Sequence, residues 1–256
     1  MIGFFDSGSG GLTVLKVVRE VLPEADVLYF GDIKNAPYGE KSREELSRLT
    51  IEAIKMLQER GATSIISACN SVSASLAVSL FDIFSLGPSQ LIEMVGPTVA
   101  YFRDSSARIL LCATPATISS DIYSQAFTMV GKQIATVAIP ELAGAIEFGE
   151  SSEKVEAIIK KSFLGVDLKN FDVLVLGCTH YPLALAAFEK LIDGSGVVLF
   201  DPAHAVAARA RGLFWPREVG GGKTVFLISQ DSEPFRARVA SLFPAEAYTC
   251  TIETLG

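Results

Sequence analysis

Short apolar runs alternate with longer amphipathic segments along almost the whole chain. The apolar runs are continuous stretches of Val, Ile, Leu and Phe, which is typical of strands buried on both faces. They predict strands at 2–5, 26–31, 63–68, 91–95, 108–112, 133–139, 172–177, 196–200 and 224–229. The amphipathic segments predict helices near 11–22, 43–60, 72–84, 97–103, 116–129, 141–148, 152–164, 182–193, 202–214 and 232–243. This alternation indicates an α/β fold with mostly parallel sheets.

Two breaks at strand ends suggest that the strands form two sheets instead of one. Gly96-Pro97 and Asp201-Pro202 are suited to a chain crossing between domains. They predict one α/β domain from 1–95 plus 203–256 and a second, inserted domain from 96–202.

Two cysteines stand in matching positions, each directly after a predicted strand. The run 62–68 leads into Cys69-Asn70-Ser71, and the run 171–177 leads into Cys178-Thr179-His180. N–H groups at a helix start favour thiolate over thiol, so we expect reactive thiols here. Ligands of open α/β sheets bind at the carboxyl ends of strands, and a cleft between the domains would bring the thiols face to face.

Composition narrows the class of protein. Hydrophobic residues make up 49% of the chain and charged residues 20%, as in a globular protein, and the net charge of −7 argues against nucleic acid or membrane surfaces as partners. The four cysteines and two histidines show neither a disulfide pattern nor metal-ligand spacing. We find no signal-peptide pattern after Met1 and no apolar stretch that would span a membrane, so we expect a cytoplasmic protein with reduced thiols.

Three further motifs allow a structural or a functional interpretation. The turn 6–11, read Asp-Ser-Gly-Ser-Gly-Gly, lacks the third glycine of a dinucleotide fingerprint, but Asp6 and Ser7 place polar groups at a strand end. The stretch 32–39 is either a plain loop or a site that presents N–H groups to a carboxylate. Gly222-Lys223-Thr224 precedes a strand and is interpreted as a surface turn. A Cys178 nucleophile with His180 or His204 as base is an alternative that leaves Cys69 without a role.

Four motifs together resemble the bacterial glutamate racemase family over essentially the whole chain. They are Asp6-Ser-Gly-Ser-Gly-Gly11, Gly31-Asp32 with Pro37-Tyr-Gly39, Ala68-Cys-Asn-Ser71, and Gly177-Cys-Thr-His-Tyr-Pro182. The last is the most specific. The resemblance implies two flavodoxin-like domains related by a pseudo-twofold axis, with the active site in the cleft between them. It also implies cofactor-independent interconversion of L- and D-glutamate, which supplies D-glutamate for peptidoglycan, and a homodimer.

The resemblance also implies roles for individual residues. Cys69 would take the α-proton from D-glutamate and Cys178 from L-glutamate, assisted by Asp6 and His180. A glutamate in the segment 141–147 would support them, with Glu147 favoured over Glu141. The substrate-binding residues would be Ser7, Asp32, Pro37, Tyr38, Gly39, Asn70, Ser71, Thr114, Thr117 and Thr179.

The chemistry itself favours two opposed bases. Inverting a stereocentre requires one group to remove a proton from one face and another to supply a proton on the opposite face. Without a cofactor, N–H and hydroxyl groups in a closed site must hold the developing carbanion.

The chain departs from the family pattern in three places. Ser71 stands where the family usually has threonine, the segment 113–117 has alanine in place of a glycine, and Ala138-Ile-Pro140 replaces a Cys-Pro step. The alternatives are an aspartate or hydantoin racemase that uses the same thiols, and an amino-acid-binding or regulatory protein without catalysis.

Overall fold

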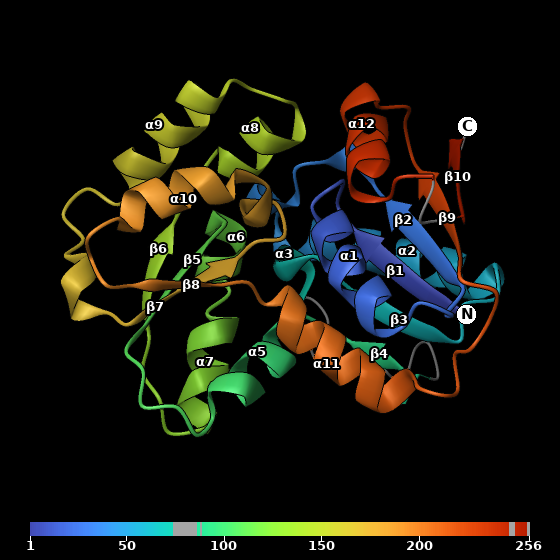
Figure 1. Cartoon of the computed structure of the whole chain (residues 1–256), viewed down its shortest axis with the longest axis horizontal. Helices are drawn as coiled ribbons and strands as arrows, with labels where there is room; N and C mark the ends of the chain where they lie inside the picture. The colour runs from blue at the N-terminus through green and yellow to red at the C-terminus, as the bar shows by residue number, and fades with distance from the viewer. Residues whose placement is uncertain (74–85, 88, 246–248, 255–256) are drawn as a thin grey trace.

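The computed structural model describes residues 1–73, 86–87, 89–245 and 249–254. It contains two sheets, and every strand pair in both is parallel. The first has the strand order β10-β9-β2-β1-β3-β4 and the second the order β6-β5-β7-β8. Figure 1 shows the sheets side by side, with both ends of the chain on the side of the first sheet.

The elements of the first sheet come from both ends of the chain. They are β1 (Ile2–Asp6), α1 (Gly11–Val21), β2 (Val27–Gly31), η1 (Ile33–Asn35), η2 (Tyr38–Glu40), α2 (Arg43–Glu59), β3 (Ser64–Ser67), α3 (Asn70–Ser73), β4 (Leu91–Ile92), α11 (Ala203–Phe214), β9 (Lys223–Ile228), α12 (Glu233–Leu242) and β10 (Thr249–Thr254). Helices α1, α11 and α12 pack on one face of this sheet, and α2 packs on the other.

The second sheet is built from the middle of the chain. Its elements are α5 (Val95–Phe102), β5 (Ile109–Ala113), α6 (Pro115–Ser119), α7 (Ile122–Met129), β6 (Ala135–Ala138), α8 (Leu142–Glu147), α9 (Ser152–Ser162), η3 (Leu168–Asn170), β7 (Val173–Gly177), η4 (Tyr181–Ala184), α10 (Leu185–Ile192) and β8 (Val198–Phe200). Apolar side chains of α8, α9 and α10 cover one face and those of α5 and α7 the other. The predicted α/β architecture with parallel sheets is therefore confirmed.

Both sheets contain the same strand order, second-first-third-fourth. It is β2-β1-β3-β4 in the first sheet and β6-β5-β7-β8 in the second, and β9 and β10 extend the first sheet beyond β2. The two cysteines follow equivalent third strands, β3 and β7. This equivalence agrees with the expected pseudo-twofold relation, and we propose that the sheets correspond to the domains 1–95 plus 203–256 and 96–202.

Several predicted boundaries differ from the structure. β10 was not predicted, because its sequence Thr-Cys-Thr-Ile-Glu-Thr is polar, as the edge strand of a sheet often is. The predicted helix 116–129 is two helices, since the chain turns at Asp121, whose φ is +56°. The predicted strand 91–95 ends at Ile92, and helix α5 already begins at Val95. Most of the predicted helix 72–84 lies outside the described residues.

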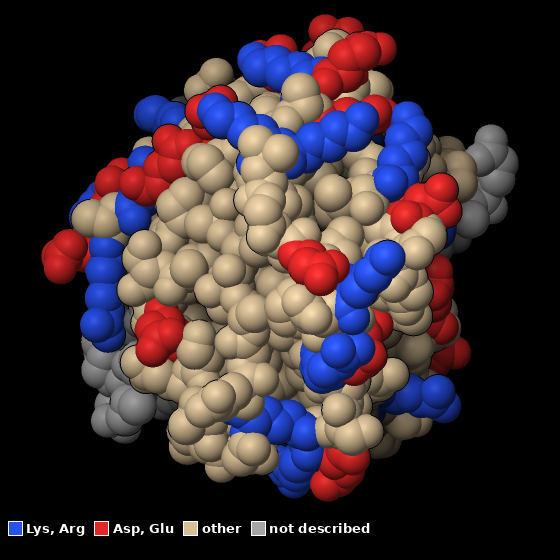
Figure 2. All heavy atoms as spheres, turned by 90° about the vertical axis from the view of Figure 1, so that its left-hand side faces the viewer, with Lys and Arg blue, Asp and Glu red and all other residues tan. Residues whose placement is uncertain are grey.

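The outer side of the second sheet's half carries few charges in its centre. Figure 2 shows this face, with Lys and Arg side chains interspersed with Asp and Glu around the rim. Among the described residues, no helix is long and apolar enough to cross a membrane.

Candidate active site

Loops at the carboxyl ends of equivalent strands from the two sheets meet around one small cavity. The first half contributes the loops after β1, β2 and β3, and the second half those after β5, β6 and β7. The lining residues are Ser7, Pro37, Tyr38, Gly39, Cys69, Asn70, Ser71, Thr114, Ala143, Cys178, Thr179 and His180. The centre of a water molecule can occupy about 10 Å³ of it, so the cavity holds roughly one water.

Both predicted thiols face this cavity and are almost fully buried. Cys69 is 5% exposed and Cys178 is 6% exposed. Cys69 Sγ lies 3.8 Å from Ser7 Oγ, and Cys178 Sγ lies 3.9 Å from His180 Nδ1. Each thiol thus has a polar partner in its own half of the molecule.

The surroundings of Cys69 favour its protonated form. Burial and the nearby Asp6 carboxylate raise the pKa of the Cys69 thiol to about 12, although the Val72 N–H opposes this. The N–H group at the start of α3 lowers the pKa of this thiol in the expected direction, but its effect is smaller than that of burial. Desolvation of a fully buried sulfur outweighs one N–H group.

Asp6 lies near Cys69 and accepts hydrogen bonds from both halves of the molecule. Its carboxyl accepts hydrogen bonds from Gly8 N at 2.9 Å and from Thr179 Oγ1 at 3.1 Å. Burial raises the pKa of Asp6, and the nearby His180 opposes that shift.

The surroundings of Cys178 contain a strongly coupled acid–base pair. His180 Nε2 donates to Glu147 Oε2 at 2.6 Å, and both side chains are buried. Burial alone would lower the pKa of His180, but hydrogen bonds to Cys178 and Glu147 outweigh it and raise the pKa to about 10. Burial would raise the pKa of Glu147, yet hydrogen bonds from His180 and Ser9 lower it to about 2. A cationic imidazole therefore lies beside the Cys178 sulfur at neutral pH.

Asn70 supplies an unused hydrogen-bond donor at the cavity. Tyr123 on α7 donates its hydroxyl to Asn70 Oδ1 at 2.6 Å, which fixes the orientation of the amide. Asn70 is 2% exposed, and its Nδ2 has no hydrogen-bond partner in the described part of the chain. A buried donor without a partner is costly, and a ligand oxygen would satisfy it.

Hydroxyl groups from both halves form a cluster beside Asn70. Ser71 Oγ lies 3.0 Å from Thr114 Oγ1 and 3.4 Å from Thr117 Oγ1. Because Ser71 and Thr114 also line the cavity, these hydroxyls can reorient toward a carboxylate.

Two of the predicted substrate-binding residues lie outside the cavity lining. The Asp32 carboxylate accepts hydrogen bonds from Tyr38 Oη at 2.6 Å, from Ser229 Oγ at 2.7 Å and from the Asn35 amide, and it thereby shapes the loop after β2. Thr117 does not line the cavity, and its Oγ1 lies 3.0 Å from Thr114 Oγ1. The other histidine, His204, is exposed on α11 and takes no part in the site.

The glycine-rich turn after β1 packs directly against the second half. A Cβ atom at Gly10 would lie 2.5 Å from Thr179 Oγ1, and one at Gly8 would lie 2.8 Å from the Glu147 carboxylate. Glycine is therefore required by close approach across the cleft. The motif contributes to the site through this contact as well as through Ser7.

Sequence reasoning missed four residues of the site. Ser9 donates to Glu147, Tyr123 orients Asn70, Ala143 lines the cavity, and Arg238 contacts α8. Ser9 belongs to a motif already singled out. The other three lie in ordinary helical segments, and nothing in the local pattern distinguishes them.

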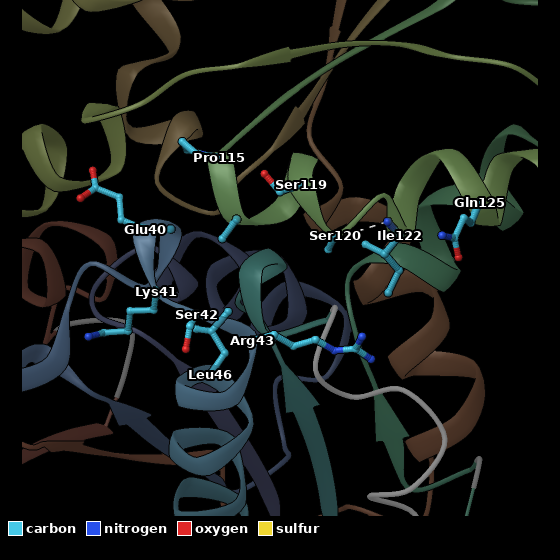
Figure 3. A pocket seen from close by; sticks show the side chains of 12 residues that line it. Glu40, Lys41, Ser42, Arg43, Leu46, Pro115, Ser119, Ser120, Ile122 and Gln125 are labelled. Atoms are coloured by element: carbon cyan, nitrogen blue, oxygen red, sulfur yellow. Dashed lines mark hydrogen bonds between the residues drawn. The ribbon is translucent and has the colours of Figure 1, made fainter.

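A larger pocket of about 590 Å³ adjoins the cavity at Gly39 (Figure 3). It is lined by Gly39, Glu40, Lys41, Ser42, Arg43, Leu46, Pro115, Ala116, Ser119, Ser120, Ile122 and Gln125. It contains no thiol or imidazole group, so the smaller cavity is the candidate reaction site. Within the described ranges, no cluster of three or more His, Cys, Asp or Glu side chains is arranged to hold a metal ion.

Comparison with known proteins identifies the family of the chain. The family model described as Asp/Glu/hydantoin racemase matches residues 13–210. A glutamate racemase of Desulforudis audaxviator is 38% identical over 213 residues, which cover 82% of this chain and 77% of that protein. Glutamate racemase 1 of Caldanaerobacter subterraneus is 32% identical over 249 residues, covering 94% and 91% of the two chains.

A solved structure gives the same result for the fold. The glutamate racemase of Francisella tularensis, determined in complex with D-glutamate, has a TM-score of 0.87 at 29% identity and covers 100% of this chain and 97% of that one. The resemblance inferred from the four motifs is thereby confirmed. The chain belongs to the Asp/Glu/hydantoin racemase family and is an amino-acid racemase of the glutamate racemase type.

Proposed function

We propose that this protein interconverts L- and D-glutamate by proton transfer between two thiols, without a cofactor. The observation that carries the proposal is the placement of Cys69 and Cys178, which reach one buried cavity from equivalent strands of two different sheets. Each thiol therefore serves one face of the substrate's α-carbon.

The two thiols have different electrostatic surroundings, and this difference assigns the role of base to one and of acid to the other. Cys178 is the base that takes the α-proton of L-glutamate, because the imidazolium of His180 lies beside its sulfur and can balance a negative charge there. Cys69 is the thiol that delivers a proton to the other face, since burial and Asp6 keep it protonated. The reverse reaction starts with the roles exchanged, and Cys69 is then the stronger base.

The α-carboxylate must be stabilised as the carbanion forms. Asn70 Nδ2 and the hydroxyls of Ser71, Thr114 and Thr179 surround the cavity and are placed to donate to it. Fixed donors in a water-excluded site are worth more than in water. Since the cavity holds about one water, the loops of the two halves must separate to admit glutamate.

The test is a circular dichroism assay of purified protein with D-glutamate or D-aspartate, in the absence of pyridoxal phosphate. We expect the D-glutamate signal to decay to zero, because equal amounts of two enantiomers cancel, and the aspartate signal to persist. Decay of the D-aspartate signal alone would show that aspartate, and not glutamate, is the substrate. No decay with either would favour an amino-acid-binding protein.

Replacement of Tyr123 by phenylalanine is expected to weaken substrate binding selectively. The ring keeps its packing, but the Asn70 amide loses the hydrogen bond that orients it. A hydrogen bond of this kind contributes about 0.5–1.5 kcal/mol, so KM for glutamate should rise roughly 2- to 12-fold. Initial rates over a range of glutamate concentrations measure this. Unchanged KM in a folded Tyr123→Phe protein would show that Asn70 does not hold the substrate.

The setting of the reaction follows from the family. We propose that the product supplies D-glutamate for peptidoglycan in the cytoplasm, and that the protein is a homodimer. The sparsely charged centre of the face in Figure 2 supports an association between copies. Sedimentation of the purified protein tests the dimer.

A further inference from the structure

Arg238 contacts residues beside the active-site cavity from helix α12. It lies on α12, in the first half of the molecule, and its side chain is 18% exposed. Its guanidinium donates to the carbonyls of Ile146 and Glu147 at the carboxyl end of α8, the latter at 3.1 Å, and to Ser9 Oγ. Figure 1 shows α12 near the segment that contains α8 and α9.

The contact with Ser9 leads to the Glu147 carboxylate. Ser9 accepts from Arg238 and donates from its Oγ to Glu147 Oε2 at 2.6 Å, and Arg238 Nη1 itself lies 3.6 Å from that oxygen. The next link runs from Glu147 to His180 and from His180 to Cys178. A continuous chain of contacts thus connects a C-terminal helix to one of the two thiols.

The arrangement requires the shape of an arginine as well as its charge. Nη1 and Nη2 address two successive carbonyls at the end of α8, where the helix dipole favours a cation. A planar guanidinium can bridge these carbonyls and a hydroxyl at once, whereas a lysine ammonium is a point charge.

We propose that Arg238 is a positioning residue that holds the Glu147 carboxylate in place. Through Glu147 it keeps the His180 imidazole beside the Cys178 sulfur. It acts on the thiol that serves L-glutamate and not on Cys69. The inference rests on the proposed two-thiol reaction and adds to it a dependence of one half-reaction on the C-terminal helix.

The test compares Arg238→Gln and Arg238→Lys with wild type. Arg238→Gln should lower kcat roughly 10- to 100-fold, since displacement of a catalytic group by about 1 Å costs up to 10²-fold. Arg238→Lys should lose less, because it keeps the charge without the bridging geometry. The matched control is Arg236→Gln on the same helix. It removes an exposed ion pair with Asp231 and should leave turnover unchanged.

Deuterium isotope effects identify the affected half-reaction. The two enantiomers are equally stable in water, so kcat/KM for L-glutamate and for D-glutamate must be equal and must fall by the same factor. The value of kcat/KM therefore does not show which thiol is affected. A slower Cys178 step should instead raise the isotope effect for α-deuterated L-glutamate and lower it for α-deuterated D-glutamate. Isotope effects equal to those of wild type would overturn the proposal, as would full activity in Arg238→Lys or Arg238→Gln.

Titration of His180 by NMR gives a second readout that does not need turnover. The chain has two histidines, and the exposed His204 serves as an internal reference. The charged groups that face His180 are Glu147, Cys178 and Asp6. If Arg238 positions Glu147, its loss should lower the pKa of His180 from about 10. An unchanged or raised pKa would overturn the positioning role. Absence of glutamate turnover in wild type would overturn the proposed function and leave this titration to judge Arg238.

Discussion

Replacement of either Cys69 or Cys178 by serine is expected to abolish inversion of glutamate while leaving exchange on one face. A serine hydroxyl is far too weak an acid to exchange protons with the α-carbon, and each positioned acid or base contributes on the order of 10²–10⁴ in rate. In D₂O, Cys69→Ser should place deuterium in L-glutamate only, through Cys178. Cys178→Ser should label D-glutamate only, through Cys69.

Circular dichroism measures the inversion, and proton NMR of the α-position measures the exchange. Cys250→Ser is the matched control, because this free cysteine lies on strand β10 and outside the cavity lining. Inversion that persists in either active-site variant would remove that thiol from the mechanism. Exchange of both enantiomers in one variant would show that a single base reaches both faces.

Replacement of Glu147 by glutamine is expected to be the most damaging change outside the two cysteines. The carboxylate accepts hydrogen bonds from Ser9 N, Ser9 Oγ and His180, and it keeps the imidazole cationic beside Cys178. An amide carries no charge, so the His180 pKa should fall toward its ordinary value. We expect kcat to fall about 10²- to 10³-fold, comparable to the loss of an electrostatic group in an active site.

The same variant should change the pH dependence of stability. His180 has its pKa raised from 6.5 to about 10, so its contribution is complete below pH 6.5 and is lost as pH rises through 10. Glu147 has its pKa lowered from 4.5 to about 2, so its contribution is complete above pH 4.5 and is lost as pH falls through 2. The stability gap between wild type and Glu147→Gln should be largest between pH 4.5 and 6.5.

Denaturant unfolding from pH 5 to pH 10 measures this gap. Glu150→Gln is the control, since the Glu150 carboxylate forms an exposed ion pair with Lys154 on the surface. A gap that stays constant, or widens as the pH rises, would contradict the ion pair between Glu147 and His180.

Much of the fold could be read from the sequence because burial on both faces leaves a direct pattern. β7, at Val173–Gly177, has an almost entirely buried run of apolar residues, and every such run proved to be a parallel strand. The strand β10 was not predicted because it lies at the edge of its sheet and its sequence is mostly polar, without a continuous apolar run. The break between α6 and α7 escaped because apolar periodicity continues across it.

The sequence by itself determined the candidates for the chemistry: two thiols after equivalent strands, with polar neighbours at each turn. Only the tertiary structure decided that Glu147 and not Glu141 contacts His180, that Arg238 and Tyr123 support the site, and that Cys69 is held as a thiol. Strand and helix patterns are local, whereas desolvation and charge pairing depend on segments brought together from opposite halves of the chain. The raised pKa of Cys69 is therefore a property of the packed cleft, although both thiols are visible in the linear sequence.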